Sequence, residues 1–130
     1  HGNSIYVIVG DNGTILTSVN GSACCSTSDD NGSSWISRSS GTTDNLSEVT
    51  FGNNTFIAVG DNGTIRTSAD NGTTWDNRTS GTTKFYGVTF GKNIFIAVGE
   101  NGTIRTSADN GTTWDNRSSG TTVNLRGVGF

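Results

Sequence analysis

The chain has 130 residues with 19 glycines and no proline, and its 15% of charged residues leave a net charge of −3 at pH 7. So weak a charge excludes a self-repelling disordered coil, the acidic balance excludes a protein that neutralises nucleic-acid phosphates, and no apolar run approaches the ~20 residues that a membrane helix needs. The abundance of Ser, Thr, Asn and Gly is typical of many short strands joined by tight turns.

The first predicted elements are two strands separated by a turn. Residues 5–9 read IYVIV and end at Gly10, and the pattern DNGTILTS follows. An insertion at residues 19–28 then lengthens the hairpin that leads to the next strand near Trp35. It contains Cys24 and Cys25, whose bridge as direct neighbours would be strained, so two free thiols or a link to another chain are comparable alternatives.

A second and a third copy of this unit follow along the chain. Residues 61–83 and 100–122 are nearly identical at an offset of 39 residues, which is the signature of a repeat architecture. In the second copy, strands are predicted at 49–51, 56–59 and 64–67, and a fourth begins at Trp75, with Asn- and Gly-rich turns between them. The unbroken apolar run at 56–59 indicates a strand that is buried on both faces.

A sheet of four such short strands cannot bury its faces alone, so neighbouring copies must cover it. Periods near 40 residues with four strands per repeat are typical of β-propeller blades. We therefore predict an all-β propeller fold with three four-stranded antiparallel blades. The first blade spans about 4–43 and is completed by strand 125–130, the second spans 46–83 and the third 85–122. A linear stack of sheets is the alternative.

One motif gives the repeats a family resemblance. Residues 68–75 read SADNGTTW and match the Asp-box, S-x-D-x-G-x-T-W, which recurs at 107–114 and more loosely at 28–35. The repeats resemble those of sialidases and other Asp-box propellers. The wider pattern, V-x-F, then A-V-G-[DE]-N-G-T-I, then the box, is even more similar to repeats of the photosystem II stability and assembly factor group. The resemblance implies a propeller but no single activity, because many activities use this blade.

The Asp-box residues are expected to be structural, as the resemblance also implies. The aspartate can accept hydrogen bonds from backbone N–H groups across its own turn, the glycine allows a positive φ, and the tryptophan fills the gap between stacked blades. A calcium loop is the weaker alternative, because the distant Glu that it needs is missing. The residues are Ser28, Asp30, Gly32, Trp35, Ser68, Asp70, Gly72, Trp75, Ser107, Asp109, Gly111 and Trp114.

Three blades are too few for a closed ring, since propellers have roughly 4–8. The chain opens on the second-strand pattern at 5–10 and closes on the first-strand pattern at 125–130. We predict that strand 125–130 of one chain completes the blade begun by residues 4–9 of another. Two chains would form a six-bladed homodimer, which is favoured because twofold assemblies are commonest, and three chains a nine-bladed homotrimer. A piece of a longer chain is the alternative.

Sialidase-type catalysis is the enzymatic alternative, and the residue inventory argues against it. That chemistry needs three arginines around a carboxylate, a Tyr nucleophile with a Glu base, and a separate acid. Arg38, Arg78 and Arg117 share one repeat position, and Arg66 and Arg105 share another, so we expect them to point outward around the ring. The single histidine, His1, provides no Ser-His-Asp triad. We therefore predict a protein that is not an enzyme and has no metal or cofactor.

The remaining prediction is a binding surface where the turns between second and third strands meet the links between blades. Amides and carboxylates can hold sugar hydroxyls beside an aromatic ring, so the expected function is that of a lectin-like module for glycans. A scaffold that docks another protein, as the assembly-factor resemblance implies, is the alternative, as is a designed propeller without a ligand; a sialidase fragment comes last. The candidate ligand-binding residues are Asp61, Glu100, Lys84, Tyr86, Asn45 and Asn124.

Overall fold

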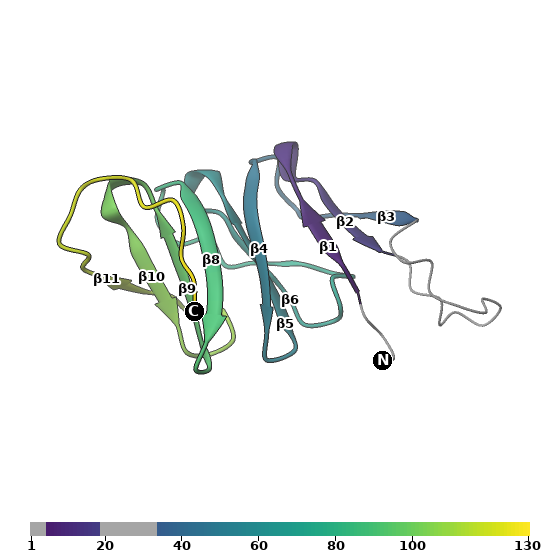
Figure 1. Ribbon diagram of the computed structural model, residues 1–130. Coiled ribbons are helices and arrows are strands. Elements are labelled where there is room, and N and C mark those ends of the chain that lie inside the picture. Colours follow the sequence, from purple (N-terminus) through teal and green to yellow (C-terminus); the bar gives the residue numbers. More distant parts are fainter. Residues whose placement is uncertain (1–4, 19–33) are drawn as a thin grey trace.

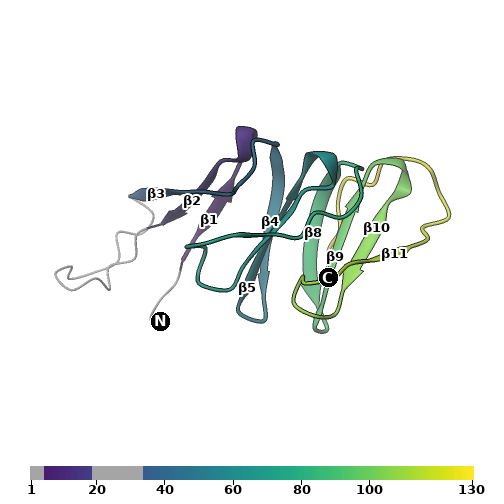
Figure 2. The same cartoon turned by 180° about the vertical axis from the view of Figure 1, so that it is seen from behind.

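The computed structural model describes residues 5–18 and 34–130 and shows three antiparallel sheets stacked side by side in chain order (Figures 1 and 2). We call them blade 1 (order β1-β2-β3), blade 2 (β4-β5-β6-β7) and blade 3 (β11-β10-β9-β8). The strands are β1 (Val7–Val9), β2 (Ile15–Ser18), β3 (Trp35–Arg38), β4 (Leu46–Gly52), β5 (Thr55–Gly60), β6 (Ile65–Ser68), β7 (Asp76–Asn77), β8 (Phe85–Gly91), β9 (Ile94–Gly99), β10 (Ile104–Ser107) and β11 (Asp115–Arg117). The predicted propeller architecture is therefore confirmed.

Parts of the first repeat cannot be compared with the prediction. The insertion with Cys24 and Cys25 lies outside the described residues, as do three members of the first Asp-box, Ser28, Asp30 and Gly32. The tryptophan of that box, Trp35, begins β3 and is half-buried.

The central strand β5 is buried along its whole length. Its alternate side chains face opposite neighbours, as the pleat of a strand requires. Ala58 packs in a cluster with Ile15 of blade 1, whereas Ile57 packs in a cluster with Phe85 and Val88 of blade 3. The prediction of burial on both faces at 56–59 is confirmed, and the hydrophobic core of this chain consists of the layers between blades.

Arg66 corrects the expectation that the repeated arginines point outward. Its side chain is only 8% exposed, and its Nη2 donates a hydrogen bond to the carbonyl oxygen of Gly41 in the link that leaves blade 1, at 3.3 Å. Burial lowers the pKa of Arg66, and the carboxylate of Asp44 opposes that shift. Arg105 occupies the same position in blade 3, where its Nη2 lies beside Gly81. Successive side chains of a strand point to opposite faces, and the residues on either side of this position face the following blade. The position itself therefore faces the preceding blade.

The last residues also differ from the prediction, because 125–130 forms no strand in this chain. The segment nevertheless lies against β8 (Figure 1), with the N–H of Leu125 donating to the carbonyl oxygen of Gly99 at 2.9 Å. A Cβ added at Gly91 would lie 2.3 Å from the ring of Phe130, and one added at Gly52 would lie 2.2 Å from the ring of Phe90. Residues 125–130 therefore sit on blade 3 as β8 sits on blade 2, but they pair with no strand among the described residues.

Candidate functional site

Three short 3-10 turns build one edge of the blades. They are η1 (Asp11–Gly13), which joins β1 to β2, and η2 (Asp61–Gly63) and η3 (Glu100–Gly102), which join the second strand of blades 2 and 3 to the third. The central Asn of each turn is left-handed, with φ of 57°, a conformation that Asn tolerates better than most residues. We call the edge formed by these turns and by the links 39–45, 79–84 and 118–124 the turn edge; it is the upper edge in Figure 1.

Glycine at the end of each turn lets the following link pack directly on it. A Cβ added at Gly63, whose φ is +70°, would lie 2.3 Å from the carbonyl oxygen of Gly81. The N–H of Ser80 donates to the carbonyl oxygen of Gly63 at 3.0 Å, which holds the link in place. The turn edge is thus rigidly attached to the sheets below it.

Three of the predicted ligand-binding residues each join the turn of one blade to the link that follows it along this edge. Asn45 accepts a hydrogen bond from the backbone N–H of Asn12 at 2.8 Å, and Asn124 accepts one from the backbone N–H of Asn101 at 3.1 Å. Lys84 holds the equivalent place in the middle link, where its Nζ lies 3.4 Å from Oδ1 of Asp61. These side chains hold each link to the turn before it, and they do not converge on a single pocket.

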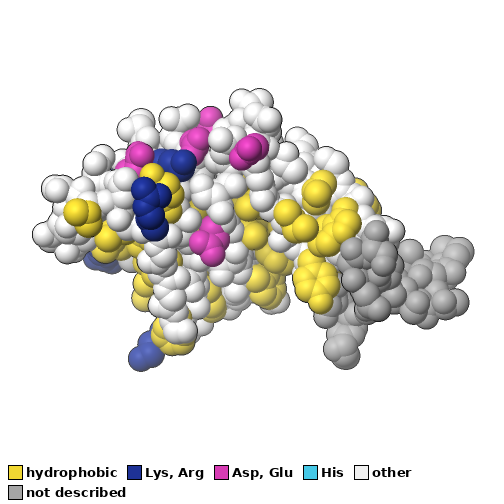
Figure 3. All heavy atoms as spheres, turned by 45° about the horizontal axis from the view of Figure 1, so that its top comes forward, with side chains coloured by type: hydrophobic (Ala, Val, Ile, Leu, Met, Phe, Trp, Pro, Cys, Tyr) yellow, Lys and Arg dark blue, Asp and Glu magenta, His cyan; other side chains and the backbone are white. Residues whose placement is uncertain are grey.

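Tyr86 is the centre of a mixed cluster between blade 3 and the segment after it. The guanidinium carbon of Arg126 lies 4.6 Å from the centroid of the Tyr86 ring, and Nζ of Lys84 lies 5.1 Å from it. Both distances are in the range of cation–π attraction. The hydroxyl of Tyr86 donates to Oε2 of Glu100 at 3.4 Å. With Asp61, these residues form what we call the tyrosine cluster; Figure 3 shows basic and acidic side chains gathered on this side of the molecule.

Arg126 was missed as a candidate, although the repeat contains the signal. It follows Leu125 as Tyr86 follows Phe85, and the two segments lie side by side because 125–130 packs against β8. Residues at one repeat position in adjacent strands of stacked blades become neighbours in space. Four predicted residues, Asp61, Lys84, Tyr86 and Glu100, therefore meet, and the structure adds Arg126 to them.

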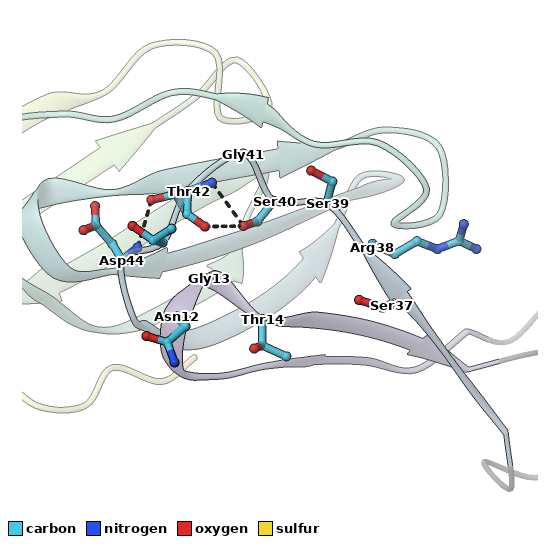
Figure 4. Close-up of a pocket in the computed structure, with 11 residues that line it drawn as sticks. Asn12, Gly13, Thr14, Ser37, Arg38, Ser39, Ser40, Gly41, Thr42 and Asp44 are labelled. Atoms are coloured by element: carbon cyan, nitrogen blue, oxygen red, sulfur yellow. Dashed lines mark hydrogen bonds between the residues drawn. The ribbon is translucent and has the colours of Figure 1, made fainter.

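Two open polar pockets of about 640 Å³ each lie farther along the turn edge, one against η1 (Figure 4) and one against η3. In the first, Oγ of Ser40 donates to the carbonyl oxygen of Thr42 at 3.1 Å. Asp44 accepts hydrogen bonds from Thr64 at 2.8 Å and Asn62 at 3.1 Å, which hold its pKa below the ordinary value. Hydroxyl and amide groups dominate both linings, and no aromatic residue contributes to either.

The Asp-box turns form closed hydrogen-bond networks. Oγ of Ser68 accepts from the N–H of Gly72 at 2.9 Å and donates to Oδ1 of Asp70 at 2.8 Å. Asp70 also accepts from the N–H of Thr74 at 2.9 Å, and the indole of Trp75 donates to the carbonyl oxygen of Gly72 at 2.8 Å. The carboxylate and the indole are thus engaged within the turn, an arrangement that leaves little capacity for a ligand.

The second complete box, at 107–114, repeats this network. Asp109 accepts hydrogen bonds from the side chain and backbone of Thr113 and from the hydroxyl of Ser107. These bonds favour the ionised carboxylate and lower the pKa of Asp109 to about 2. In Asp70 burial raises the pKa, but the bonds from Thr74 and Ser68 outweigh it and the pKa is again lowered.

Two kinds of feature are missing from the described ranges. Within residues 5–18 and 34–130, no three His, Cys, Asp or Glu side chains gather in a way that could hold a metal ion. In the same ranges, no helix has the length and hydropathy to cross a lipid bilayer.

Comparison with known proteins places the chain in a family. A family described as the DUF6242 beta propeller domain matches residues 1–125. The chain belongs to this family. A solved structure described as "YCF48 bound to D1 peptide" superposes with a TM-score of 0.63 at 18% identity, over 89% of this chain and 38% of the other. The DUF6242 chain thus spans less than half of that propeller, with which it shares the fold. None of the curated proteins matches it.

Proposed function

We propose that this chain is a non-enzymatic docking module that holds an extended polypeptide on its turn edge, at the tyrosine cluster. The observation that carries the proposal is Arg126, which is exposed and lies over the ring of Tyr86. Among the described residues Arg126 makes no ion pair, unlike Lys84, which is close to Asp61. The cluster therefore offers a cation whose charge is free for a partner.

The chemistry of the cluster indicates the partner. A carboxylate on the partner can pair with the guanidinium of Arg126, and such charge-assisted bonds are strong and directional. Val123, three residues before Arg126 in the link 118–124, is an exposed apolar side chain. An acidic peptide with a neighbouring apolar side chain fits both. The YCF48 structure, which is described as bound to a peptide, supports a polypeptide partner by analogy.

Peptide selection tests this proposal. A random peptide library displayed on phage would be selected on the immobilised chain, and the enriched peptides would be titrated against Arg126→Ala. We expect enrichment of acidic peptides and about a tenfold loss of affinity in the variant, which corresponds to ~1.4 kcal/mol. The matched control is Lys92→Asn, which removes one positive charge at the opposite edge and installs the residue that blade 2 carries there, Asn53.

The outcomes separate cleanly. Loss of binding in the Arg126 variant with retention in the Lys92 variant supports docking at the cluster. If no peptide is enriched, or if the enriched peptides bind both variants equally, the tyrosine cluster is not the docking site.

Carbohydrate binding is a second candidate, favoured by the hydroxyl- and amide-lined pockets beside η1 and η3. Two features count against it. Sugar sites commonly stack the ring on an aromatic face, the pocket linings contain none, and Arg126 lies over the ring of Tyr86. A glycan array on the intact chain tests it: enrichment of saccharides that Arg126→Ala still binds would favour a glycan site in the pockets over peptide docking.

A further inference from the structure

The first strands of blades 2 and 3 contain a β-bulge at the same repeat position. In β4 the register shifts between Leu46 and Glu48, which makes Ser47 an extra residue with no partner in β5. In β8 the same shift lies between Phe85 and Gly87. A bulge bends its strand and re-aims side chains, and bulges are frequent beside functional sites. The residues that the two shifts set apart are called bulge pairs here; they are Ser47 with Glu48, and Tyr86 with Gly87.

The core contacts on either side of a bulge pair show what the bulge does. Leu46 and Val49 both pack in the layer beside blade 1, although an offset of three residues would place them on opposite faces of a regular strand. Phe85 and Val88 have the same offset and share the layer between blades 2 and 3. The bulge takes up the additional residue, which leaves both members of the blade 2 pair exposed.

The bulge pairs lie on the side of the molecule where the blades converge. β4 packs against β8 (Figure 1), whereas β7 and β11, at the other edge of the same sheets, make no comparable contact. The blades therefore fan out from the side of the first strands, which is where a propeller has its central channel. Both first strands begin at the turn edge, so the bulge pairs adjoin the tyrosine cluster.

The bulge pairs also lie where the otherwise similar repeats differ most. Residues 49–52 and 88–91 both read VTFG, yet the four residues before them differ throughout, with NLSE at 45–48 and KFYG at 84–87. Two blades with the same strand order and the same bulge thus tolerate different side chains at these positions. The blade itself does not determine those side chains, which leaves them available for binding a partner.

Glu48 and Arg126 bring opposite charges to the bulge pair of blade 3. A Cβ added at Gly87 would lie 3.1 Å from Oε1 of Glu48, so this carboxylate lies over a residue without a side chain. The preceding residue, Tyr86, has the guanidinium of Arg126 over its ring. Both charged side chains are exposed, and neither makes an ion pair among the described residues. The surface thus presents a carboxylate and a guanidinium whose charges are both free for a partner.

We propose that Glu48 is the acidic half of the docking site and binds a basic side chain of the docked polypeptide. This proposal rests on the docking function proposed above, and it specifies the partner more closely. The partner would be an extended segment with an acidic residue for Arg126 and a Lys or Arg near it for Glu48. A uniformly acidic segment would place like charges against Glu48, which is unfavourable, so Glu48 gives the site selectivity against such peptides.

Parallel peptide selections test the role of Glu48. The same random phage library would be selected on the intact wild-type chain and on Glu48→Lys, and both pools would be sequenced. We expect the wild-type pool to combine an acidic with a basic residue, and the Glu48→Lys pool to keep the acidic residue and lose the basic one. The matched control is Asp76→Lys, which makes the same change of charge on β7, at the far edge of the same blade. Its pool should resemble that of the wild type.

A double-mutant cycle measures the contact directly. A synthetic peptide from the wild-type pool should bind Glu48→Gln about fivefold more weakly than the wild type, which is the size of an exposed ion pair. Replacing the basic residue of the peptide by norleucine should remove this difference. Because Glu48 is exposed, Glu48→Gln should keep the wild-type circular dichroism.

The results distinguish the role of Glu48 from the docking function itself. If the enriched peptides depend on Arg126 but bind Glu48→Gln as tightly as the wild type, docking stands and the role of Glu48 is wrong. The role is also wrong if the Glu48→Lys pool keeps the basic residue. Peptides that depend on Glu48 and not on Arg126 would support the role of Glu48 and overturn that of Arg126. A selection that enriches no peptide overturns both.

Discussion

Blades 1 and 2 share one sequence pattern, yet equivalent strands have different surroundings. Ile8 of β1 is 45% exposed, whereas Ala58, at the same repeat position in β5, is fully buried. The larger apolar side chain is thus the more exposed, the reverse of what hydrophobicity alone would give. Within the part of the chain that the structure describes, blade 2 has a sheet on both faces and blade 1 has one on a single face. In this architecture burial depends on the neighbouring blade, and residue type is secondary.

The largest expected loss of stability comes from truncating the apolar residue that begins the first-strand position, which is Phe85 between blades 2 and 3 and Leu125 after blade 3. Phe85→Ala removes a fully buried ring from the layer between blades 2 and 3, and it should cost about 4 kcal/mol of unfolding free energy. Leu125→Ala truncates the equivalent, half-buried residue at the open end and should cost about 1 kcal/mol. Urea denaturation at one protein concentration measures both. Equal losses would mean that blade 3 is covered as completely as blade 2.

A smaller difference in stability is expected between substitutions at two glycines, one packed against a neighbouring blade and one in open space. A Cβ at Gly111 would lie 2.5 Å from Cδ1 of Ile57 in the preceding blade, whereas one at Gly120 meets nothing within 4 Å. Both have a positive φ, so Ala costs roughly 1–2 kcal/mol of backbone strain at either position. Overpacking adds about 1–3 kcal/mol at Gly111 only. Chemical denaturation of Gly111→Ala and Gly120→Ala measures the difference, and similar values would contradict the close packing of the Asp-box on its neighbour.

The smallest expected effect is on the loss of folding stability at acidic pH. The pKa of Asp109 is about 2 in the folded chain, against an ordinary value of 3.8. Between these values the unfolded chain binds the proton more readily, so stability is lost as pH falls from about 4 to about 2. Thermal unfolding at a series of pH values should show a shallower loss in Asp109→Asn than in wild type. Asp115→Asn, which removes a carboxylate 3.7 Å from Arg117, is the control. If both variants have the same pH slope, the turn network does not carry the effect.

Much of the fold is readable from local pattern. The strands at 49–51, 56–59 and 64–67 were predictable because their alternation and turn residues are local properties, and the repeat makes each prediction in triplicate. The Asp-box hydrogen bonds are local for the same reason, since they join residues two to four positions apart. The buried Arg66 was not predictable in this way, because its partner, Gly41, lies 25 residues earlier in another blade.

The candidate site also contains residues that the sequence could predict and residues that it could not. Asp61, Lys84, Tyr86 and Glu100 could be grouped from the chain order of turns and links, which share one edge of any propeller blade. Arg126 could not, because it joins Tyr86 only through the packing of 125–130 on β8. Nor could the sequence show that Asn45 and Asn124 use their amides to hold neighbouring turns.

By itself the amino-acid sequence determined the repeat, its four-stranded unit and the need of each unit for neighbours, because turn chemistry and side-chain alternation act over a few residues. Only the tertiary structure decided which faces are covered, where the arginines of the repeat point, and that the last residues lie on blade 3 without pairing with any described strand. Those features depend on contacts between blades, and a residue's partner in the next blade is invisible in its own sequence neighbourhood.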